Sequence, residues 1–551
     1  GLDGSAVPTY FITATDPGQD YEKNHRTTYN GVVQADTVSG TWGRYQQKNL
    51  SSRVLMSYGY GDGGGGPSRE MLEYGRRLAC GIPGIPKFEF DSLHHFLKEL
   101  SLQVEKNRNK LPRWVGELYL EYHRGSYTTM ARNKKYNRRA ELRLMEAEGL
   151  CTMTGTLLDE AYPAGELDKV WQTVLLNQFH DIIPGSSIRQ VYEESKKQYE
   201  NVFKTLGMIS SNARDHIVEN IAVGSASLVV FNPTGFSTGN LVETRLPDWC
   251  RSVKSPEGVI LPVQRGYDGK SLLFVPSVPS KGYSVFELSK EEAPADGSIK
   301  VDGNTIENSY YRIELDENGL ITSIFDKPNS REVLRKGEKG NKLTAFEDIP
   351  HNFDAWDINI YYREKFWDLT DAEKISVLER GPVRCTVEVR RRFLDSTVIQ
   401  HIQVYNDSPR IDFKTHIDWK EKHILLKAAF PVEVHSDKAV YDIQFGNIER
   451  PTHWNTSWDT ARFEVCGHKW ADLSENGYGV SLMNDCKYGY DIKDGTMRLT
   501  LLKSAVSPNE DADREEHDFI YSLLPHQGDF RTCTVPQAYA LNIPFEAVLS
   551  S

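Results

Sequence analysis

A histidine and an aspartate lie side by side where two apolar, helix-like stretches are interrupted. Residues 175–192 read LLNQFHDIIPGSSIRQVY, with the break at Pro184-Gly185. An imidazole beside a carboxylate at the end of a helix suits contact with a metal or a substrate. His180 and Asp181 are candidates for that contact, and a satisfied pair that caps the helix end is the alternative. Ser187 and Gln190 have the spacing of a helix N-cap and its N3 partner.

A second candidate is the single acid in a glycine-rich stretch, GDGGGGP at 61–67. Consecutive glycines let a backbone approach a ligand closely. The stretch is not the dinucleotide-binding fingerprint and lacks the Lys and Ser/Thr of phosphate-binding loops, which argues against nucleotide binding. Asp62 is therefore a candidate general acid at the end of an expected strand. A flexible surface loop is the alternative.

Aromatic and hydroxyl side chains are dense in residues 114–130, WVGELYLEYHRGSYTTM. Tyr122, His123 and Arg124 precede a glycine and combine an aromatic ring, an imidazole and a guanidinium. That mixture suits stacking on a polyol and hydrogen bonding to it. Ordinary interface aromatics before a helix are the alternative.

Composition narrows the class of protein. The 551 residues carry a net charge of −12 with no basic block, so nucleic acid is an unfavourable partner. We expect no membrane partner, because no run of 18 apolar residues occurs. The start of the chain does not have the pattern of a signal peptide. The seven cysteines are scattered and form no CxxC pair, which favours a reducing compartment, the cytoplasm.

Residue patterns predict a multidomain α+β fold. Residues 1–110 read as the C-terminal half of an α/β catalytic domain, with strands at 9–14 and 54–61 and a helix at 69–79. A strand, an Asp91 or Ser92 cap and a helix are expected over 88–101.

Residues 111–221 show apolar spacings of three and four that predict a three-helix bundle. The marker residues are Leu142, Met145 and Glu146 in the first helix, Leu167 to Phe179 in the second, and Val191 to Ile209 in the third.

After residue 222 the apolar period becomes two, as in β-strands. We expect a small β domain over 222–294 and a large antiparallel β-sandwich region over 295–551. Polar-aromatic segments at 352–358, 467–479 and 484–491 are either surface loops or loops that close over a cleft. His435-Ser436-Asp437 has the letters of a metal-binding pair but lies in a strand pattern, so we interpret it as a decoy.

Six motifs in a fixed order resemble the glycoside hydrolase family 38 α-mannosidases, in particular the cytosolic and bacterial branch. They are GDGGGGP at 61–67, GELYLEYHRGSYTT at 116–129, NQFHDIIPGSSI at 177–188, DAWDI at 354–358, HKWADLSENGYGVSLMNDCKYGYD at 468–491 and LLPHQGD at 523–529.

The resemblance implies a zinc-dependent, retaining α-mannosidase that removes terminal α-linked mannose from oligosaccharides. It also implies a partial α/β barrel-like domain ahead of the bundle and the β region. By this resemblance His180 matches a zinc ligand, Asp181 matches an acid that binds sugar hydroxyls, and Asp62 matches the general acid/base. Tyr122, His123 and Tyr127 match residues of the sugar cleft.

The family's N-terminal His-x-Asp pair and its nucleophile have no match, so the chain reads as a fragment that lacks the family's N-terminal part. We expect zinc in the complete protein and expect the chain alone to be inactive. An N-terminal fragment of the same protein and further copies of the chain are open as partners. A catalytically inactive glycan-binding module on the same scaffold is the alternative function.

Overall fold

The computed structural model describes residues 1–20, 22–23, 26–294 and 299–550. The chain forms two compact units, residues 1–115 and 116–551, and each is described by itself. Within the described residues, no helix is both long and apolar enough to cross a membrane.

The first unit consists of short helices joined by irregular segments. The helices are α1 (Ala35–Arg44), η1 (Asp62–Gly64), α2 (Arg69–Ala79), α3 (Leu93–Lys106) and η2 (Arg108–Lys110). The serine hydroxyls of Ser68 and Ser92 accept hydrogen bonds from the first turns of α2 and α3, as N-caps do. The prediction of helix 69–79 and of a Ser92 cap is confirmed.

The strands predicted at 9–14, 54–61 and the start of 88–101 are wrong. These residues are irregular, and the described part of the unit holds isolated bridges only, such as the parallel bridge from Gly31 to Tyr58. A strand needs a continuous ladder with a neighbour, and an apolar sequence run alone does not supply that neighbour. A barrel-like domain stays a prediction.

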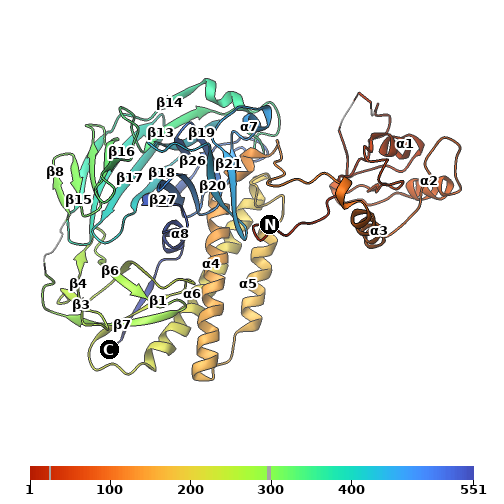
Figure 1. Ribbon diagram of the computed structural model, residues 1–551. Helices are drawn as coiled ribbons and strands as arrows, with labels where there is room; N and C mark the ends of the chain where they lie inside the picture. The colour runs from red at the N-terminus through yellow and green to blue at the C-terminus, as the bar shows by residue number, and fades with distance from the viewer. Residues whose placement is uncertain (21, 24–25, 295–298, 551) are drawn as a thin grey trace. The chain divides into compact units, whose positions relative to one another are not determined.

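Three helices begin the second unit, after the short helix η3 (Arg124–Tyr127), and lie side by side in Figure 1. They are α4 (Ala131–Leu158), α5 (Ala164–Asn177) and α6 (Arg189–Glu219). Their shared core contains Leu144, Val170, Val174 and Val202. The predicted three-helix packing is present, although Met145 is exposed and Leu144 takes the inner position.

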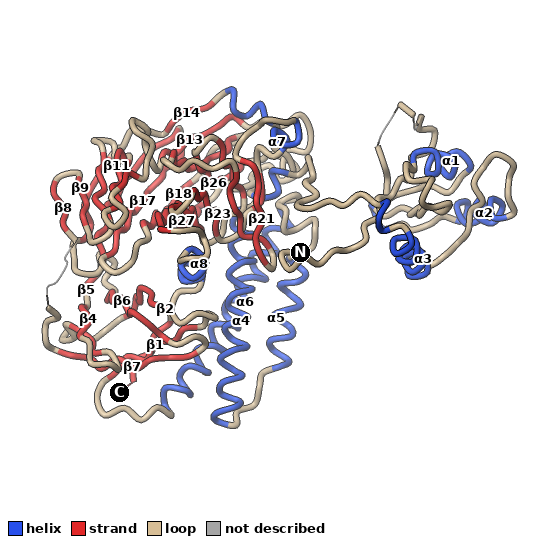
Figure 2. Tube along the Cα trace, viewed as in Figure 1, coloured by secondary structure: helices blue, strands red, loops and turns tan. Residues whose placement is uncertain are grey.

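In the described part of this unit the strand ladders are antiparallel, and Figure 2 shows the strands in red and the long helices in blue. A five-stranded sheet and a three-stranded sheet follow the bundle. In order of pairing, the five strands are β28 (Glu546–Ser550), β1 (Ser227–Asn232), β7 (Gly282–Ser289), β3 (Ser252–Lys254) and β4 (Ile260–Pro262). The three strands are β2 (Thr238–Thr244), β6 (Ser271–Val278) and β5 (Gln264–Arg265).

The last strand corrects the expected organisation of the β region. β28 pairs with β1, with Val548 opposite Val229, so residues 546–550 complete the five-stranded sheet that contains β1 (Figure 1). The range 295–551 was expected to belong to the large β region throughout. The predicted boundary itself falls at 295–298, outside the described residues, and the other domain boundaries stay predictions.

Two large sheets enclose the main core. The nine-stranded sheet comprises β15 (Lys374–Glu379), β16 (Arg384–Phe393), β17 (Ser396–Tyr405), β18 (Ile411–Asp418), β27 (Glu516–Gln527), β24 (Tyr478–Asn484), β23 (Trp470–Glu475), β20 (Lys438–Ile443) and β21 (Gly446–Pro451). The six-stranded sheet comprises β14 (Phe366–Asp368), β13 (Lys342–Glu347), β19 (Ile424–Pro431), β26 (Thr496–Lys503), β25 (Gly489–Lys493) and β22 (Val465–Cys466). Phe413 and Tyr521 of the first pack with Phe430 of the second in one apolar cluster.

A further five-stranded sheet joins this core through Ile313 and Ile324. It comprises β12 (Arg331–Glu332), β11 (Ile321–Asp326), β10 (Tyr311–Leu315), β9 (Thr305–Glu307) and β8 (Lys300–Asp302). Three short helices lie between strands, η4 (Ile360–Glu364), α7 (Ser457–Ala461) and α8 (Thr534–Asn542). The architecture is therefore multidomain α+β with antiparallel sheets, as the residue patterns predict.

Candidate functional site

The turn between α5 and α6 presents the predicted histidine and aspartate to solvent. The side chains of His180 and Asp181 are 78% and 59% exposed, and His180 Nε2 lies 3.5 Å from Asp181 Oδ2. The His180 ring contacts the ring of Phe179, with centroids 4.4 Å apart. An imidazole and a carboxylate are thus held next to each other with most of their surface free for a ligand.

Backbone contacts fix this turn against the segment before α4. Gly185 has a φ of +92°, and a Cβ there would lie 2.4 Å from the carbonyl oxygen of Thr129. Only glycine allows such a close approach with this backbone. The buried Lys134 ammonium donates to the carbonyls of Thr129 and Ile183, the latter at 2.9 Å, and burial lowers its pKa to about 7.

The predicted capping role of Ser187 is wrong. Helix α6 begins at Arg189, and its N-cap is Ile188, which has no side-chain cap. The Ser187 hydroxyl instead donates to the carbonyl of Asp181 at 2.6 Å. It therefore stabilises the turn that carries the histidine rather than the helix that follows.

Tyr122, His123 and Tyr127 lie around η3, where the chain enters the bundle. Tyr122 is 62% exposed and His123 is exposed with a φ of +63°, whereas Tyr127 is half-buried. Burial raises the pKa of Tyr127, so its hydroxyl keeps its proton. Arg124, next to them, is buried and donates to the carbonyl of Ala461 at 2.8 Å. It anchors the turn and does not face a ligand.

Hydrogen bonds connect the DAWDI motif at 354–358 to the residues around η3. The Thr129 hydroxyl donates to the carbonyl of Ala355 at 2.7 Å, and the Ser126 amide donates to the carbonyl of Trp356 at 3.2 Å. Ile182 and Trp356 pack on one small apolar cluster with Met130. We call residues 122–130, 180–187 and 353–358 together the corner.

The other motifs with polar and aromatic residues form strands. Residues 470–484 form the hairpin β23–β24, and 489–493 form β25, all largely buried. They also hold α4, because Arg138 donates to Asn484 Oδ1 at 2.8 Å and stacks over the ring of Tyr488. The interpretation of 467–479 and 484–491 as loops, over a cleft or on the surface, is therefore wrong for most of their length.

Asp62 lies in the first unit, at the start of η1, and is exposed. Its carboxylate accepts hydrogen bonds from the Tyr29 hydroxyl at 2.8 Å and from the side-chain Nδ2 of Asn30 at 2.9 Å. The side-chain Oδ1 of Asn30 accepts from the backbone amides of Gly61 and Asp62. The glycine-rich stretch is therefore pinned, and the side chains that pin it come from 31 to 33 residues earlier.

Sequence reasoning missed Tyr29 and Asn30, because neither stands in a pattern with Asp62. Whether Asp62 faces His180 and Asp181 stays a prediction, since the two units are described separately.

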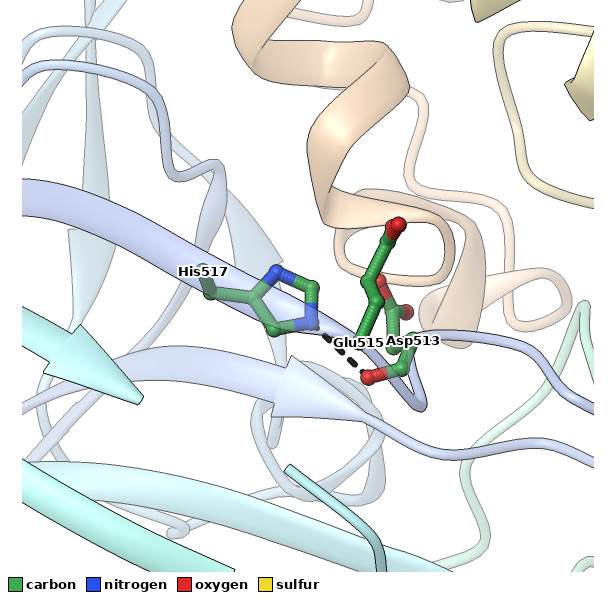
Figure 3. A group of neighbouring side chains, drawn as sticks. All are labelled: Asp513, Glu515 and His517. Carbon is green, nitrogen blue, oxygen red and sulfur yellow. Dashed lines mark hydrogen bonds between the residues drawn. The ribbon is translucent and has the colours of Figure 1, made fainter. Parts of the chain in front are cut away.

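A further group of residues that could hold a metal ion comprises Asp513, Glu515 and His517, drawn in Figure 3. Sequence reasoning missed this group as well. Their ligand atoms lie within 4.8 Å of one another. Alternate positions before and within β27 carry these side chains, in the stretch DADREEHD. That alternation is the only sequence signal, and it equally describes an ordinary strand.

Each member of this group already has a structural partner. The Asp513 carboxylate accepts from the backbone amides of Met130 and Ala131, both at 2.7 Å, at the start of α4. His517 Nε2 lies 2.8 Å from the carbonyl oxygen of Asp513, the contact dashed in Figure 3. Glu515 pairs with Arg132. We call this group the α4 cap.

Burial sets the charges in the α4 cap. It raises the pKa of Asp513 to about 6 and lowers the pKa of His517 to about 3. A neutral imidazole whose Nε2 donates to a carbonyl keeps only Nδ1 as a ligand atom. Both Asp513 oxygens already accept a backbone amide, so we interpret the group as structural.

Three family models match the chain in succession. They are described as the glycosyl hydrolases family 38 N-terminal domain at residues 1–117, the alpha mannosidase middle domain at 121–217 and the glycosyl hydrolases family 38 C-terminal domain at 306–511. The corner has residues in the middle-domain and C-terminal-domain matches, and Asp62 lies in the N-terminal one.

Curated relatives and a solved structure agree with this assignment. Alpha-mannosidase G of Dictyostelium discoideum is 37% identical over 99% of this chain and 52% of its own length. Human alpha-mannosidase 2C1 is 35% identical over 100% of this chain and 50% of its own. The structure of an alpha-mannosidase from Enterococcus faecalis V583 matches with a TM-score of 0.73 and 17% identity, over 93% of this chain and 68% of that one.

The expectation that the family's N-terminal part is missing is not supported, because the N-terminal domain model matches residues 1–117. The comparisons give no support to an inactive chain or to the cytosolic branch in particular. The chain spans about half the length of the curated relatives it matches. With the two family 38 domain models matching more than half of its residues, the chain belongs to glycoside hydrolase family 38.

Proposed function

We propose that this chain is an α-mannosidase, which hydrolyses terminal α-linked mannose from oligosaccharides, and that the residues described above form part of its active site. Family membership supports this, as do the names of the curated relatives. The observation that carries the proposal is the exposed His180–Asp181 pair on a turn fixed by Gly185 and Lys134. A rigid, solvent-facing imidazole and carboxylate can bind a ligand without first breaking internal contacts.

In the proposed reaction Asp62 is the general acid/base. It protonates the leaving oxygen and then takes a proton from the attacking water, as retaining glycosidases require. The hydrogen bonds from Tyr29 and Asn30 orient its carboxylate. The second carboxyl group of such a mechanism stands about 5–5.5 Å away. We assign no residue of this chain to it.

Zinc is the proposed metal, and His180 would hold it. An exposed neutral imidazole is a suitable zinc donor, and catalytic zinc sites use three protein ligands. Bound there, zinc would supply a Lewis acid and a template for sugar hydroxyls. His180, with the Asp181 carboxylate beside it, would supply one ligand of the set. The α4 cap does not fit a metal, for the reasons given above.

Four other corner residues bind the sugar in this proposal: Asp181, Tyr122, His123 and Tyr127. The Asp181 carboxylate accepts hydrogen bonds from mannose hydroxyls. Tyr122 and His123 present exposed rings to the apolar face of the sugar, and the Tyr127 hydroxyl, which stays protonated, donates a hydrogen bond. Hydroxyl-directed contacts of this kind discriminate between sugars that differ at one carbon.

We extend the proposal to the cytoplasm as the compartment. All seven cysteines are free, which suits a reducing environment. The net charge of −12 disfavours nucleic acid as a partner. An N-terminal fragment of the same protein and a homo-oligomer stay predictions.

Hydrolysis of 4-nitrophenyl α-mannoside by the 551-residue chain tests the proposal, with 4-nitrophenyl β-mannoside as the control substrate. We expect release from the α-mannoside only, with an α-configured first product by NMR and a loss of at least about 100-fold in Asp62→Asn. A chain that binds mannosides but never releases nitrophenol, with zinc added, would be the glycan-binding module instead. If Asp62→Asn hydrolysed the α-mannoside at an undiminished rate, Asp62 would not be the general acid/base.

A further inference from the structure

One exposed phenylalanine in the corner is displayed in an unusual way. Phe353 is 63% exposed and has a φ of +57°. A bulky side chain seldom adopts this left-handed backbone, and such residues persist where the surrounding structure fixes them. No part of the reaction proposed above uses this ring.

Hydrogen bonds hold the chain at Phe353 and in the residues that follow it. Its carbonyl accepts from the amides of Trp356 and Asp357, both at 2.9 Å. The next residue, Asp354, accepts from the Val506 amide at 2.7 Å, and the Ala355 carbonyl accepts from the Thr129 hydroxyl. The ring is therefore presented by a fixed loop and loses little conformational freedom when it binds a ligand.

The ring does not stand alone. Phe353 meets Trp356 edge to face, with centroids 6.2 Å apart. The carbonyl of Trp356 accepts from the Ser126 amide, and its indole packs on the cluster that also contacts Ile182. Through Trp356, the two rings belong to the same packed region as η3 and the turn that carries His180.

We propose that Phe353, supported by Trp356, is a stacking platform for the sugar ring on the leaving-group side of the scissile bond. This inference rests on the proposed function. A phenyl ring offers no hydrogen bond, so it binds the apolar face of a ring without regard to its hydroxyl pattern. Polar corner residues select the terminal mannose, and an apolar platform suits the neighbouring sugar, whose identity and linkage vary.

Two substrates with different leaving groups separate this role from catalysis. α-Mannosyl fluoride has no ring in its leaving group, whereas an α-linked mannobiose has one. For Phe353→Ala in the 551-residue chain we expect kcat/KM to fall about tenfold on mannobiose and to change less than about twofold on the fluoride. Equal losses on both substrates, or no loss on mannobiose, would overturn the platform.

Binding provides a readout that does not depend on turnover. Titration calorimetry with mannobiose and methyl α-mannoside should show about tenfold weaker binding of the disaccharide alone in Phe353→Ala. If the unaltered chain hydrolyses neither substrate, the proposed function fails. The titration then tests the platform role of Phe353 independently of turnover. That role is overturned if the variant binds both ligands as tightly as the unaltered chain does.

Matched variants control for folding and for general loss of aromatic surface. Phe353→Tyr keeps the ring and should retain activity on mannobiose. Phe445 has the same residue type and a similar left-handed backbone, with a φ of +59°; it is fully exposed and lies in the turn between β20 and β21. Phe445→Ala should leave both substrates unaffected, and the unfolding temperature of each variant should match that of the unaltered chain. A loss in Phe445→Ala equal to that in Phe353→Ala would also overturn the proposal.

Discussion

The corner and the α4 cap contain the same kinds of side chain and use them in opposite ways. His180 and Asp181 are mostly exposed and contact each other at 3.5 Å. His517 and Asp513 are buried, and the partners of both are backbone groups. An imidazole and a carboxylate become a ligand site only when their hydrogen-bonding capacity is not already used by the fold.

The difference also shows where each pair acts. The corner lies on a turn whose position depends on Gly185 and Lys134, so its side chains are available and its backbone is fixed. The α4 cap links the start of α4 to a segment 383 residues later in the chain, so its side chains stabilise the unit. Substitutions should therefore affect activity in the first region and stability in the second.

The largest expected effect is on stability, in Asp513→Ala. The change leaves the amides of Met130 and Ala131 buried without an acceptor, which should cost about 3 kcal/mol of unfolding free energy. Thermal and urea unfolding measure it. Glu510→Ala removes an exposed acid three residues earlier and should cost little. An unchanged unfolding temperature in Asp513→Ala would contradict the structural role of the α4 cap.

His180→Ala should do the reverse. We expect at least about a 100-fold loss of kcat/KM on 4-nitrophenyl α-mannoside, with unfolding free energy within about 0.5 kcal/mol of the unaltered chain. His435→Ala is the matched control, because its side chain is also exposed and its sequence context resembles a metal-binding pair. If His180→Ala retained activity, or if His435→Ala lost as much, the corner would have no specific role in activity and the contrast with the α4 cap would be wrong.

A pH series distinguishes the buried histidine from exposed ones. The pKa of His517 is lowered to about 3 in the folded protein, so the unfolded chain binds a proton first as pH falls from about 6.5. Its contribution to stability is present above pH 6.5 and is lost towards pH 3. The raised pKa of Asp513 has the opposite effect on stability between pH 3.8, its ordinary pKa, and about pH 6. In that range the folded state binds more protons than the unfolded state, so this carboxyl adds stability as the pH falls.

When the pH falls from 7 to 5, protonation of His517 in the unfolded state should lower the unfolding free energy of the unaltered chain. In His517→Gln the decrease should therefore be about 2 kcal/mol smaller. The glutamine amide can still donate to the Asp513 carbonyl. His416→Gln alters a histidine on the surface of the neighbouring strand, paired with Asp518 at 2.9 Å, and serves as the control. Urea unfolding at each pH measures the effect, and identical pH profiles for His517→Gln and the unaltered chain would count against a buried neutral imidazole.

The smallest expected effect is in Ser187→Ala. Loss of its hydrogen bond to the Asp181 carbonyl should loosen the turn and lower kcat/KM about threefold, at a cost of about 1 kcal/mol or less in stability. Ser186→Ala is the control, because the Ser186 hydroxyl is buried without a hydrogen-bond partner. If Ser187→Ala instead destabilised the start of α6 and spared activity, the capping role predicted from sequence would be right after all.

Local signals in the sequence predicted much of the helical structure. The cap at Ser92 and the apolar spacing of Val170 and Val174 each involve residues within a few turns of one another. The predicted strands at 9–14 and 54–61 failed because a strand depends on a neighbour that its own residues do not specify. The loops predicted at 467–479 and 484–491 instead contribute to β23, β24 and β25, and Asn484 accepts a hydrogen bond from Arg138 of α4.

By itself the sequence determined that this chain has a helical bundle followed by antiparallel β structure, and it predicted His180, Asp181 and Asp62 as residues for chemistry. Only the tertiary structure decided that β28 completes the sheet of β1, that Tyr29 and Asn30 hold Asp62, and that Asp513 binds the start of α4 while His517 binds the Asp513 carbonyl. The physical reason is range. Helical periodicity and capping act between near neighbours, whereas strand pairing and burial of polar groups join residues whose separation leaves no pattern in the sequence.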